Sequence, residues 1–422
     1  MAATTGDLQA LRQAAEGGNA EACYRLAVAL LPGGDAEAAF GLMQRAAGAG
    51  HGAAQVEAAR MLLHGVGVAA DPAKAVAWLQ DAEGNGNLVA GYHLAQVAVG
   101  NLALARDGSI DRRVMAAVQA GFPPALRVAA IHFGRKPAPG DQRLCMQLLG
   151  DAARAGDAVC AALLAERLAH GEGVKADADA AAQWRERARA GGMAVLPRIE
   201  ADVPQQASVA PGALELRDAL YTPRVELHAQ QPRVGVIDGL LSADECRLLI
   251  ACAQPALRHS QAVDPNTGLP VTMPLRTSSD ASFDPVMEDL ALRLVQLRIA
   301  ASAGVELVQA EHLIVLRYQP GEEYRPHRDY VPPGTIERDR PRAGNRARTI
   351  CVYLNEVDEG GETEFPVPGV RVPPKAGRAV VFDNLKPNGQ PEPDSLHAGL
   401  PVTRGEKWLA TLWLRQRPYR DF

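Results

Sequence analysis

Residues 324–330 read YRPHRDY and place His327 two positions before Asp329. They follow LIVLRYQPGEE, an apolar run typical of a strand, and Pro326 cannot donate a hydrogen bond to a strand ladder. This predicts that His327 begins an edge strand or lies at the mouth of a barrel. Side chains at i and i+2 of a strand point to the same face, so His327 and Asp329 could bind one metal. A polar patch on a strand edge is the alternative interpretation.

Strand-like segments surround this motif. HLIVLRYQ, RTICVYLN, GETEFP, GVRVPP, RAVVFDN and KWLATLWL are separated by turns that contain glycine and proline. Many short strands with such turns predict a sandwich or a double-sheet jelly roll. Upstream, RVGVIDGLLSADECRLLIACA predicts a strand and then a helix, in which Ser242 and Glu245 have the spacing of a capping box.

The segment SLHAGLPVTRGEKWLATLWL adds His397 and, ten residues later, Lys407 at the start of a strand. Two histidines and one carboxylate form the facial triad of non-haem Fe(II) oxygenases. By strand alternation Lys407 shares a face with Leu409, Thr411 and Trp413, although we expect Trp413 to belong to the core rather than to a site. A lysine that points into a barrel is costly unless an anion pairs with it, and a dicarboxylate cosubstrate would supply one.

Together these segments resemble the catalytic domain of the prolyl 4-hydroxylases, within the 2-oxoglutarate/Fe(II) dioxygenases. The likeness extends from about residue 232 to residue 422, and H-x-D, GGET and SLHAG…GEKW occur in family order. The resemblance implies that His327, Asp329 and His397 bind Fe(II). It also implies oxidative decarboxylation of 2-oxoglutarate coupled to hydroxylation of a substrate, since related halogenases lack the carboxylate ligand.

The resemblance also implies roles for residues that bind the cosubstrate and the substrate. Lys407 would pair with the far carboxylate of 2-oxoglutarate and Tyr318 would hydrogen-bond to it, although Tyr318 could instead be a core aromatic. L-Ascorbate, which rescues the iron after uncoupled turnover in this family, is a further expected cofactor. PLRTSSDASF resembles the family's R-T-S segment near the peptide groove, so Arg276 and Ser278 could touch substrate or could simply build a turn. The segment 331–348, rich in proline, arginine and glycine, is expected to form a lid.

The first half of the chain is rich in alanine and repeats itself. A period between 32 and 36 residues predicts stacked helical hairpins, in which a glycine ends a helix in the left-handed conformation. HGVGVAADPAKAVAWLQ and HGEGVKADADAAAQWRE resemble SEL-like repeats, relatives of the tetratricopeptide family, from which the middle copies depart. The resemblance implies a curved α-solenoid that binds protein or peptide, with a spacer or dimerisation arm as the alternative. The anchor glycines are Gly18, Gly50, Gly86, Gly121, Gly156 and Gly191.

The predicted fold is therefore an N-terminal all-α solenoid of helical hairpin repeats followed by a C-terminal double-stranded β-helix, or jelly roll, with flanking helices. The repeats should occupy residues 8–198 and the oxygenase domain residues 231–422. Between them, 199–230 is punctuated by proline and glutamine and is expected to be a linker.

Composition limits the kinds of partner and the cellular compartment that the sequence predicts. The net charge of −5 comes from 44 basic and 49 acidic residues without a basic block, so no nucleic-acid partner is expected. No apolar run approaches the roughly 20 residues that span a bilayer, and the first residues lack a signal-peptide pattern. The 6 cysteines are scattered without a C-x-x-C pair, which favours a reducing compartment and a cytoplasmic location. The oligomeric state stays open.

Three functions are compatible with these patterns. The first is a dioxygenase that hydroxylates a peptidyl substrate, with proline in a protein recruited by the repeats as the leading case. The second applies the same chemistry to a free amino acid, a natural product or another side chain. The third is an adaptor in which a repeat scaffold carries a vestigial oxygenase barrel, although decay would not keep the triad and Lys407 together.

Overall fold

The structure is a computed structural model that describes residues 5–100, 103–201, 212–260, 262–263, 270–271, 276–284, 286, 288–332 and 341–420. Residues 333–340 of the expected lid at 331–348 lie outside these residues, and Arg346–Arg348 belong to a strand. The chain divides into two compact units, Met1–Ala125 and Leu126–Asp421.

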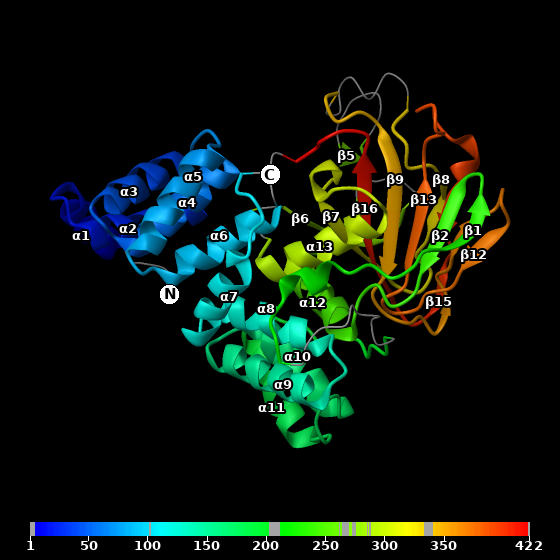
Figure 1. Cartoon of the computed structure of the whole chain (residues 1–422), viewed down its shortest axis with the longest axis horizontal. Helices are drawn as coiled ribbons and strands as arrows, with labels where there is room; N and C mark the ends of the chain where they lie inside the picture. The colour runs from blue at the N-terminus through cyan, green and yellow to red at the C-terminus, as the bar shows by residue number, and fades with distance from the viewer. Residues whose placement is uncertain are drawn as a thin grey trace. The chain divides into compact units, whose positions relative to one another are not determined.

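Unit 1 consists of helices that pack against their neighbours in the chain as hairpins (Figure 1). The sequence favours these helices because alanine has a high helix propensity and because Asn19, Asp35 and Asp71 cap helix N-termini with their side chains. The small alanine side chains let the helices approach closely, and the buried core consists largely of alanine with leucine, valine and methionine. The helices are α1 (Thr5–Glu16), α2 (Ala20–Leu30), α3 (Ala36–Gly48), α4 (Gly52–His64), α5 (Pro72–Gly84), α6 (Leu88–Gly100) and α7 (Ser109–Gln119), with a short 3-10 turn, η1 (Leu31–Gly33).

The repeat glycines take the expected left-handed conformation in five of the six copies. At Gly18, Gly50, Gly86, Gly121 and Gly156 the φ angle lies between 74° and 98°. In the sixth copy the prediction was wrong. Gly191 has a φ of −86° as the C-cap of the last repeat helix, and Gly192 has the positive φ of 87°. The left-handed residue is the second one after the helix end, and two adjacent glycines conceal that position in the sequence.

Unit 2 begins with further repeat helices, so the last hairpins pack together with the oxygenase domain. Among the described residues no single helix is both long and apolar enough to cross a membrane; α7 and α8 meet such criteria only when taken together, and they are bent by 116°. The repeat helices here are α8 (Pro123–Gly134), α9 (Pro139–Arg154), α10 (Ala158–His170) and α11 (Ala178–Ala190).

Two antiparallel sheets form the C-terminal part of unit 2, and each predicted strand segment contributes a strand. One sheet has eight strands in the order β1-β2-β13-β9-β16-β7-β6-β3, and the other has four in the order β12-β11-β14-β8. The first consists of β1 (Glu226–Gln230), β2 (Arg233–Ile237), β13 (Ala379–Asp383), β9 (Arg346–Tyr353), β16 (Lys407–Arg415), β7 (Leu313–Tyr318), β6 (Ser279–Phe283) and β3 (Arg258–His259); the second of β12 (Val370–Val372), β11 (Thr363–Phe365), β14 (His397–Gly399) and β8 (Tyr324–His327).

The two sheets share one hydrophobic core, as the two sheets of a jelly roll do. Val234 and Tyr353 from the larger sheet pack in the same cluster as Phe365 and Val372 from the smaller one. Two helices lie against the larger sheet, α12 (Ala243–Ala253) and α13 (Leu290–Ser302) (Figure 1). These features confirm the predicted fold class. Two short pairs, β10 (Glu359–Gly360) with β15 (Val402–Arg404) and β4 (Ala262–Val263) with β5 (Pro270–Val271), and the 3-10 turns η2 (Leu216–Leu220), η3 (Gln254–Ala256), η5 (Leu307–Gln309) and η6 (Pro393–Ser395) complete the domain.

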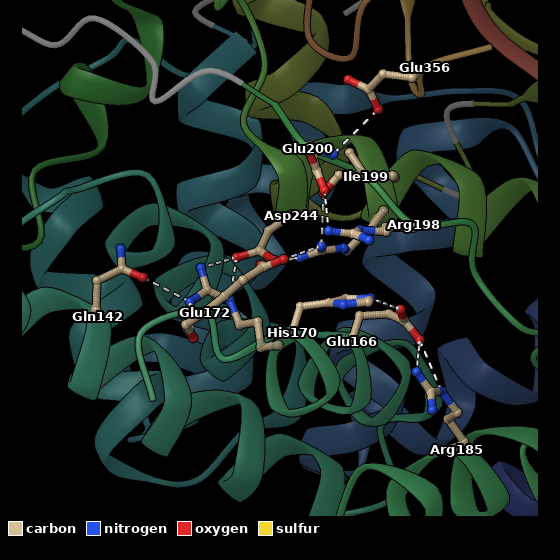
Figure 2. Close-up of polar contacts among 12 residues, drawn as sticks. Gln142, Glu166, His170, Glu172, Arg185, Arg198, Ile199, Glu200, Asp244 and Glu356 are labelled. Atoms are coloured by element: carbon tan, nitrogen blue, oxygen red, sulfur yellow. Dashed lines mark hydrogen bonds and ion pairs between the residues drawn. The ribbon is translucent and has the colours of Figure 1, made fainter. Parts of the chain in front are cut away.

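The predicted capping box is present at the start of α12, and the same turn joins the oxygenase domain to the repeats. Asp244 accepts a hydrogen bond of 2.8 Å from Nε of Arg167 in α10 and pairs with Arg247 at 3.2 Å (Figure 2). Arg247 also holds both oxygens of Glu172 at 2.6 Å, and Arg167 donates to Gln142. Asp244, Arg167 and Arg247 are all charged and buried, so removing one leaves another unpaired.

The neighbouring Glu245 makes a second connection. Its carboxylate pairs with Arg135, directly after α8, at 2.5 Å and with Arg298 of α13 at 2.8 Å. Gly134, the last residue of α8, lets α8 approach α12 closely, because a Cβ at Gly134 would lie 2.6 Å from an oxygen of Asp244. The last two hairpins are thus bound to α12 through buried ion pairs.

The first residues of the segment predicted as a linker are hydrogen-bonded to residues of the oxygenase domain. The carbonyl of Ile199 accepts from Arg247, and the backbone N–H of Glu200 donates to Glu356 (Figure 2). Residues 202–211 lie outside the part of the chain that the structure describes. The boundaries at 198 and 231 stay predictions, because compact packing divides the chain at Ala125 instead.

Candidate metal and cosubstrate site

The sheet register brings His327, Asp329 and His397 together. His327 and His397 lie directly opposite each other where β8 pairs with β14. Nε2 of His327 is 3.6 Å from Oδ1 of Asp329, and Nε2 of His397 is 3.7 Å from Oδ2. The three ligand atoms all lie within 4.8 Å of one another, and no other group of three such residues was found among the described residues.

Strand alternation does not place Asp329 on the same face as His327. β8 is an edge strand, as expected, but His327 ends it rather than begins it. Asp329 therefore lies beyond the strand, and alternation does not place it. Because the ladder with β14 stops at the His327–His397 pair, the chain can turn Asp329 toward β9, where Oγ1 of Thr349 donates a hydrogen bond of 2.7 Å to Oδ2.

Hydrogen bonds fix which nitrogen of each histidine faces the centre. Nδ1 of His327 lies 2.8 Å from the carbonyl oxygen of Arg325, and Nδ1 of His397 lies 3.0 Å from that of Ser395. A carbonyl only accepts, so each Nδ1 carries a hydrogen and each Nε2 is the nitrogen that faces the centre. Burial, together with the neighbouring His327, lowers the pKa of His397 to about 4, so its ring is neutral at pH 7.

The charge state of Asp329 completes the donor set. Burial opposes ionisation of this carboxyl, but His397, His327 and Arg346 together hold its pKa below the ordinary value. Two imidazoles and one carboxylate are the ligands that non-haem Fe(II) oxygenases use. The residues present therefore fit Fe(II).

Lys407 and Tyr318 lie beside this cluster as direct partners in the ladder between β16 and β7. Lys407 is only 1% exposed, its Nζ lies 5.1 Å from the Tyr318 ring centroid, and none of the ion pairs of the described residues involves it. Burial lowers the pKa of Lys407 to about 8 and raises the pKa of Tyr318, so the phenol keeps its hydrogen. A buried cation beside a hydroxyl donor fits one carboxylate of a small dicarboxylate.

All of these side chains open into one cavity with an empty volume of about 440 Å³. Arg276 also lines it, paired with Asp280 at 2.7 Å. Ser278 does not line it. That side chain is fully buried, with its Oγ 3.0 Å from Oγ of Ser260. The cavity is lined by Arg276, Leu316, Tyr318, Tyr324, His327, Asp329, Cys351, Thr363, His397, Gly399, Lys407, Leu409, Thr411 and Trp413.

Sequence reasoning missed two aromatic walls of this cavity. Trp413, assigned to the core, lines it, and the guanidinium of Arg346 lies 3.9 Å from its ring centroid. The alternation from Lys407 along β16 already contained this signal. Tyr324 stacks on the ring of His327, with 3.4 Å between the centroids. No motif marked Tyr324, because its role depends on a cavity rather than on a spacing.

Comparison with known proteins agrees with the site. Residues 313–415 match the 2OG-Fe(II) oxygenase superfamily, and residues 20–51, 52–87 and 158–193 match the Sel1 repeat. Probable prolyl 4-hydroxylase 10 of Arabidopsis thaliana is 35% identical over 215 residues, which cover 46% of this chain and 73% of the relative. Prolyl 4-hydroxylase 1 of the same plant is 36% identical over 206 residues, with 46% and 72% covered.

Among solved structures, a viral collagen prolyl hydroxylase from Paramecium bursaria Chlorella virus-1 in complex with 2OG is 29% identical. The alignment covers 43% of this chain and 95% of that one, with a TM-score of 0.35. Fold and site together define a 2-oxoglutarate- and Fe(II)-dependent oxygenase with helical repeats. Within that class, the chain belongs to the prolyl 4-hydroxylase family.

Proposed function

We propose that this oxygenase hydroxylates a proline residue in a peptide or protein substrate. The observation that carries the proposal is the single cavity that joins the His327, Asp329 and His397 cluster to the buried Lys407. The relatives named as prolyl 4-hydroxylases supply the choice of proline. Fe(II) held by the cluster would supply oxidation of 2-oxoglutarate by O2, coupled to hydroxylation of a substrate C–H bond.

The protein's own residues bind and orient the reactants. Lys407 pairs with the far carboxylate of 2-oxoglutarate, and the Tyr318 hydroxyl donates to the same group. Arg276 and Trp413, which line the cavity, would touch the substrate, and the apolar walls would exclude water from the reacting atoms. L-Ascorbate would restore the iron after turnovers without substrate.

We assign recruitment of the substrate protein to the repeats of unit 1. In unit 2 the ends of α8 and α10 are already covered by α12 through the ion pairs of Asp244 and Glu245. Those hairpins therefore support the oxygenase domain, and the repeats of unit 1 supply the surface that binds the substrate protein. A cytoplasmic location stays part of the proposal, supported by the six cysteines, all of which are free thiols.

The test is succinate formation from 2-oxoglutarate with Fe(II), ascorbate and O2, measured with and without proline-rich peptides. We expect succinate to rise with the peptide, to vanish in His397→Ala and to accompany a gain of one oxygen on proline. A peptide with alanine in place of proline is the matched control. Turnover that ignores the peptide would favour the second candidate, a free amino acid, natural product or other side chain. Absence of succinate and of bound iron would restore the adaptor hypothesis.

A further inference from the structure

Two buried polar side chains that no motif indicated lie behind Asp329. Thr349 belongs to β9, and Asn384 directly follows β13; neither is exposed at all. Oγ1 of Thr349 lies 2.7 Å from Oδ2 of Asp329, and Nδ2 of Asn384 lies 2.8 Å from Oγ1 of Thr349. Phe382 faces Thr349 across the β13–β9 ladder, which brings Asn384 within reach.

The direction of this hydrogen-bond relay follows from its chemistry. An ionised carboxylate only accepts, so the Thr349 hydroxyl must donate to Asp329. The lone pair that remains on Thr349 then accepts from the amide NH2 of Asn384. With the amide turned over, its oxygen would compete with Asp329 for the single hydroxyl hydrogen. Among the described residues Oδ1 of Asn384 has no hydrogen-bond partner, so nothing opposes this orientation.

The backbone of Asn384 is connected to a second ligand, His397, through a series of hydrogen bonds. Its N–H donates to the carbonyl of Ala347 at 2.9 Å, and its own carbonyl accepts from the N–H of Glu392 at 2.9 Å. The Glu392 carbonyl in turn accepts from the Ser395 hydroxyl at 2.7 Å. The carbonyl of Ser395 is the acceptor that orients Nδ1 of His397. Asn384 is therefore connected to two of the three ligands.

We propose that Asn384 and Thr349 are positioning residues of the metal centre. The relay holds Asp329 through Oδ2 and leaves Oδ1 as the oxygen that binds the metal. It also removes the freedom of the carboxylate to rotate, since Asp329 lies beyond the end of β8 and no ladder fixes it. The inference rests on the proposed metal site, and its test separates the two.

The experiment measures Mn(II) binding to the full-length protein by calorimetry. Thr349→Val keeps the shape and removes the hydroxyl, and we expect it to weaken Mn(II) binding by about 10–100-fold. Thr349→Ser restores the hydroxyl and should bind as the wild type does. Asn384→Asp replaces the donor with an acceptor, which draws the Thr349 hydroxyl away from Asp329. We expect the same weakening there, and the double variant should be no weaker than either single one.

Circular dichroism and metal-free unfolding show which variants are folded. Folded Thr349→Val with wild-type Mn(II) affinity would overturn the proposal. If that variant does not fold, weakened binding in Asn384→Asp with wild-type binding in Thr349→Ser supports it, and wild-type binding in Asn384→Asp overturns it. His397→Ala reports on the site itself. Mn(II) binding that survives in His397→Ala would refute the metal site, whereas its loss there beside unchanged Thr349→Val would refute the relay alone.

Discussion

The position of Lys407 should make the protein less stable in the absence of its cosubstrate. The ammonium group is buried, no ion pair of the described residues involves it, and the nearby Tyr318 and Tyr353 offer only their ring faces, at 5.1 and 5.5 Å. Removing a charge from water without supplying a counter-charge is unfavourable. The carboxylate of 2-oxoglutarate would supply it, so folding and cosubstrate binding are coupled at this residue.

The lowered pKa of Lys407 gives the size of the loss in folding stability and its dependence on pH. Burial lowers the pKa of Lys407 from 10.5 to about 8, which at about 1.4 kcal/mol per pH unit corresponds to about 3 kcal/mol. Below pH 8 both folded and unfolded chains carry the proton, and the penalty is complete. Between pH 8 and 10.5 the unfolded chain binds more protons, so stability rises with pH. Above that window the penalty has disappeared.

The change that tests this is Lys407→Met, which keeps the apolar stem and removes the charge. Without metal or 2-oxoglutarate, we expect the variant to be more stable than the wild type at pH 7 by up to about 3 kcal/mol. This advantage should shrink as pH rises through the window. Urea unfolding at several pH values measures it. Added Mn(II) and 2-oxoglutarate should raise the midpoint of the wild type more than that of the variant.

Lys386→Met is the matched control, because Lys386 is exposed and its removal should change neither quantity. Lys407→Met that is less stable than the wild type at pH 7, while the control is unchanged, would contradict the assignment of an uncompensated buried cation. A stability gain that does not depend on pH would point to improved packing. Unchanged stabilisation by 2-oxoglutarate would separate Lys407 from the cosubstrate.

His397→Ala should abolish succinate formation and Mn(II) binding, and retained binding would argue against the site. Asp244→Ala should reduce the free energy of unfolding by about 3–5 kcal/mol, because it leaves buried Arg167 without its carboxylate. Asp151→Ala, at an exposed ion pair, should cost about 1 kcal/mol or less in the same urea experiment. Arg276→Gln should raise the KM for peptide and leave succinate formation without peptide unchanged.

The sequence was sufficient to predict the structure wherever the interactions that determine it are local. The capping box at Ser242, the left-handed glycines and the strand-forming segments all depend on residues a few positions apart. The metal cluster was predictable as well, although strand alternation explains only part of it. His327 and His397 meet because β8 and β14 pair in one register, and Asp329 is turned toward them from beyond the strand.

Contacts between distant segments were not predictable. Thr349 and Asn384 belong to strands whose pairing no short pattern encodes, and their role appears only when β9 and β13 lie side by side. Trp413 was assigned to the core because most tryptophans on strands lie there, whereas the cavity decides its role here. Ser278 shows the converse, since this family-like position in the sequence is fully buried and does not line the cavity.

The ion pairs around α12 explain why one core position of the last repeat differs from the same position in α4 and α6. Arg167 lies ten residues after Asp157, which caps α10. At ten residues after the corresponding position, α4 has Met61 and α6 has Val97, both buried within their own hairpin stack. The scaffold is thus the same, but in the last copy an apolar core position has become an arginine that binds Asp244. A buried arginine is unfavourable without its partner, so this repeat depends on the oxygenase domain and would be destabilised if it were separated from it.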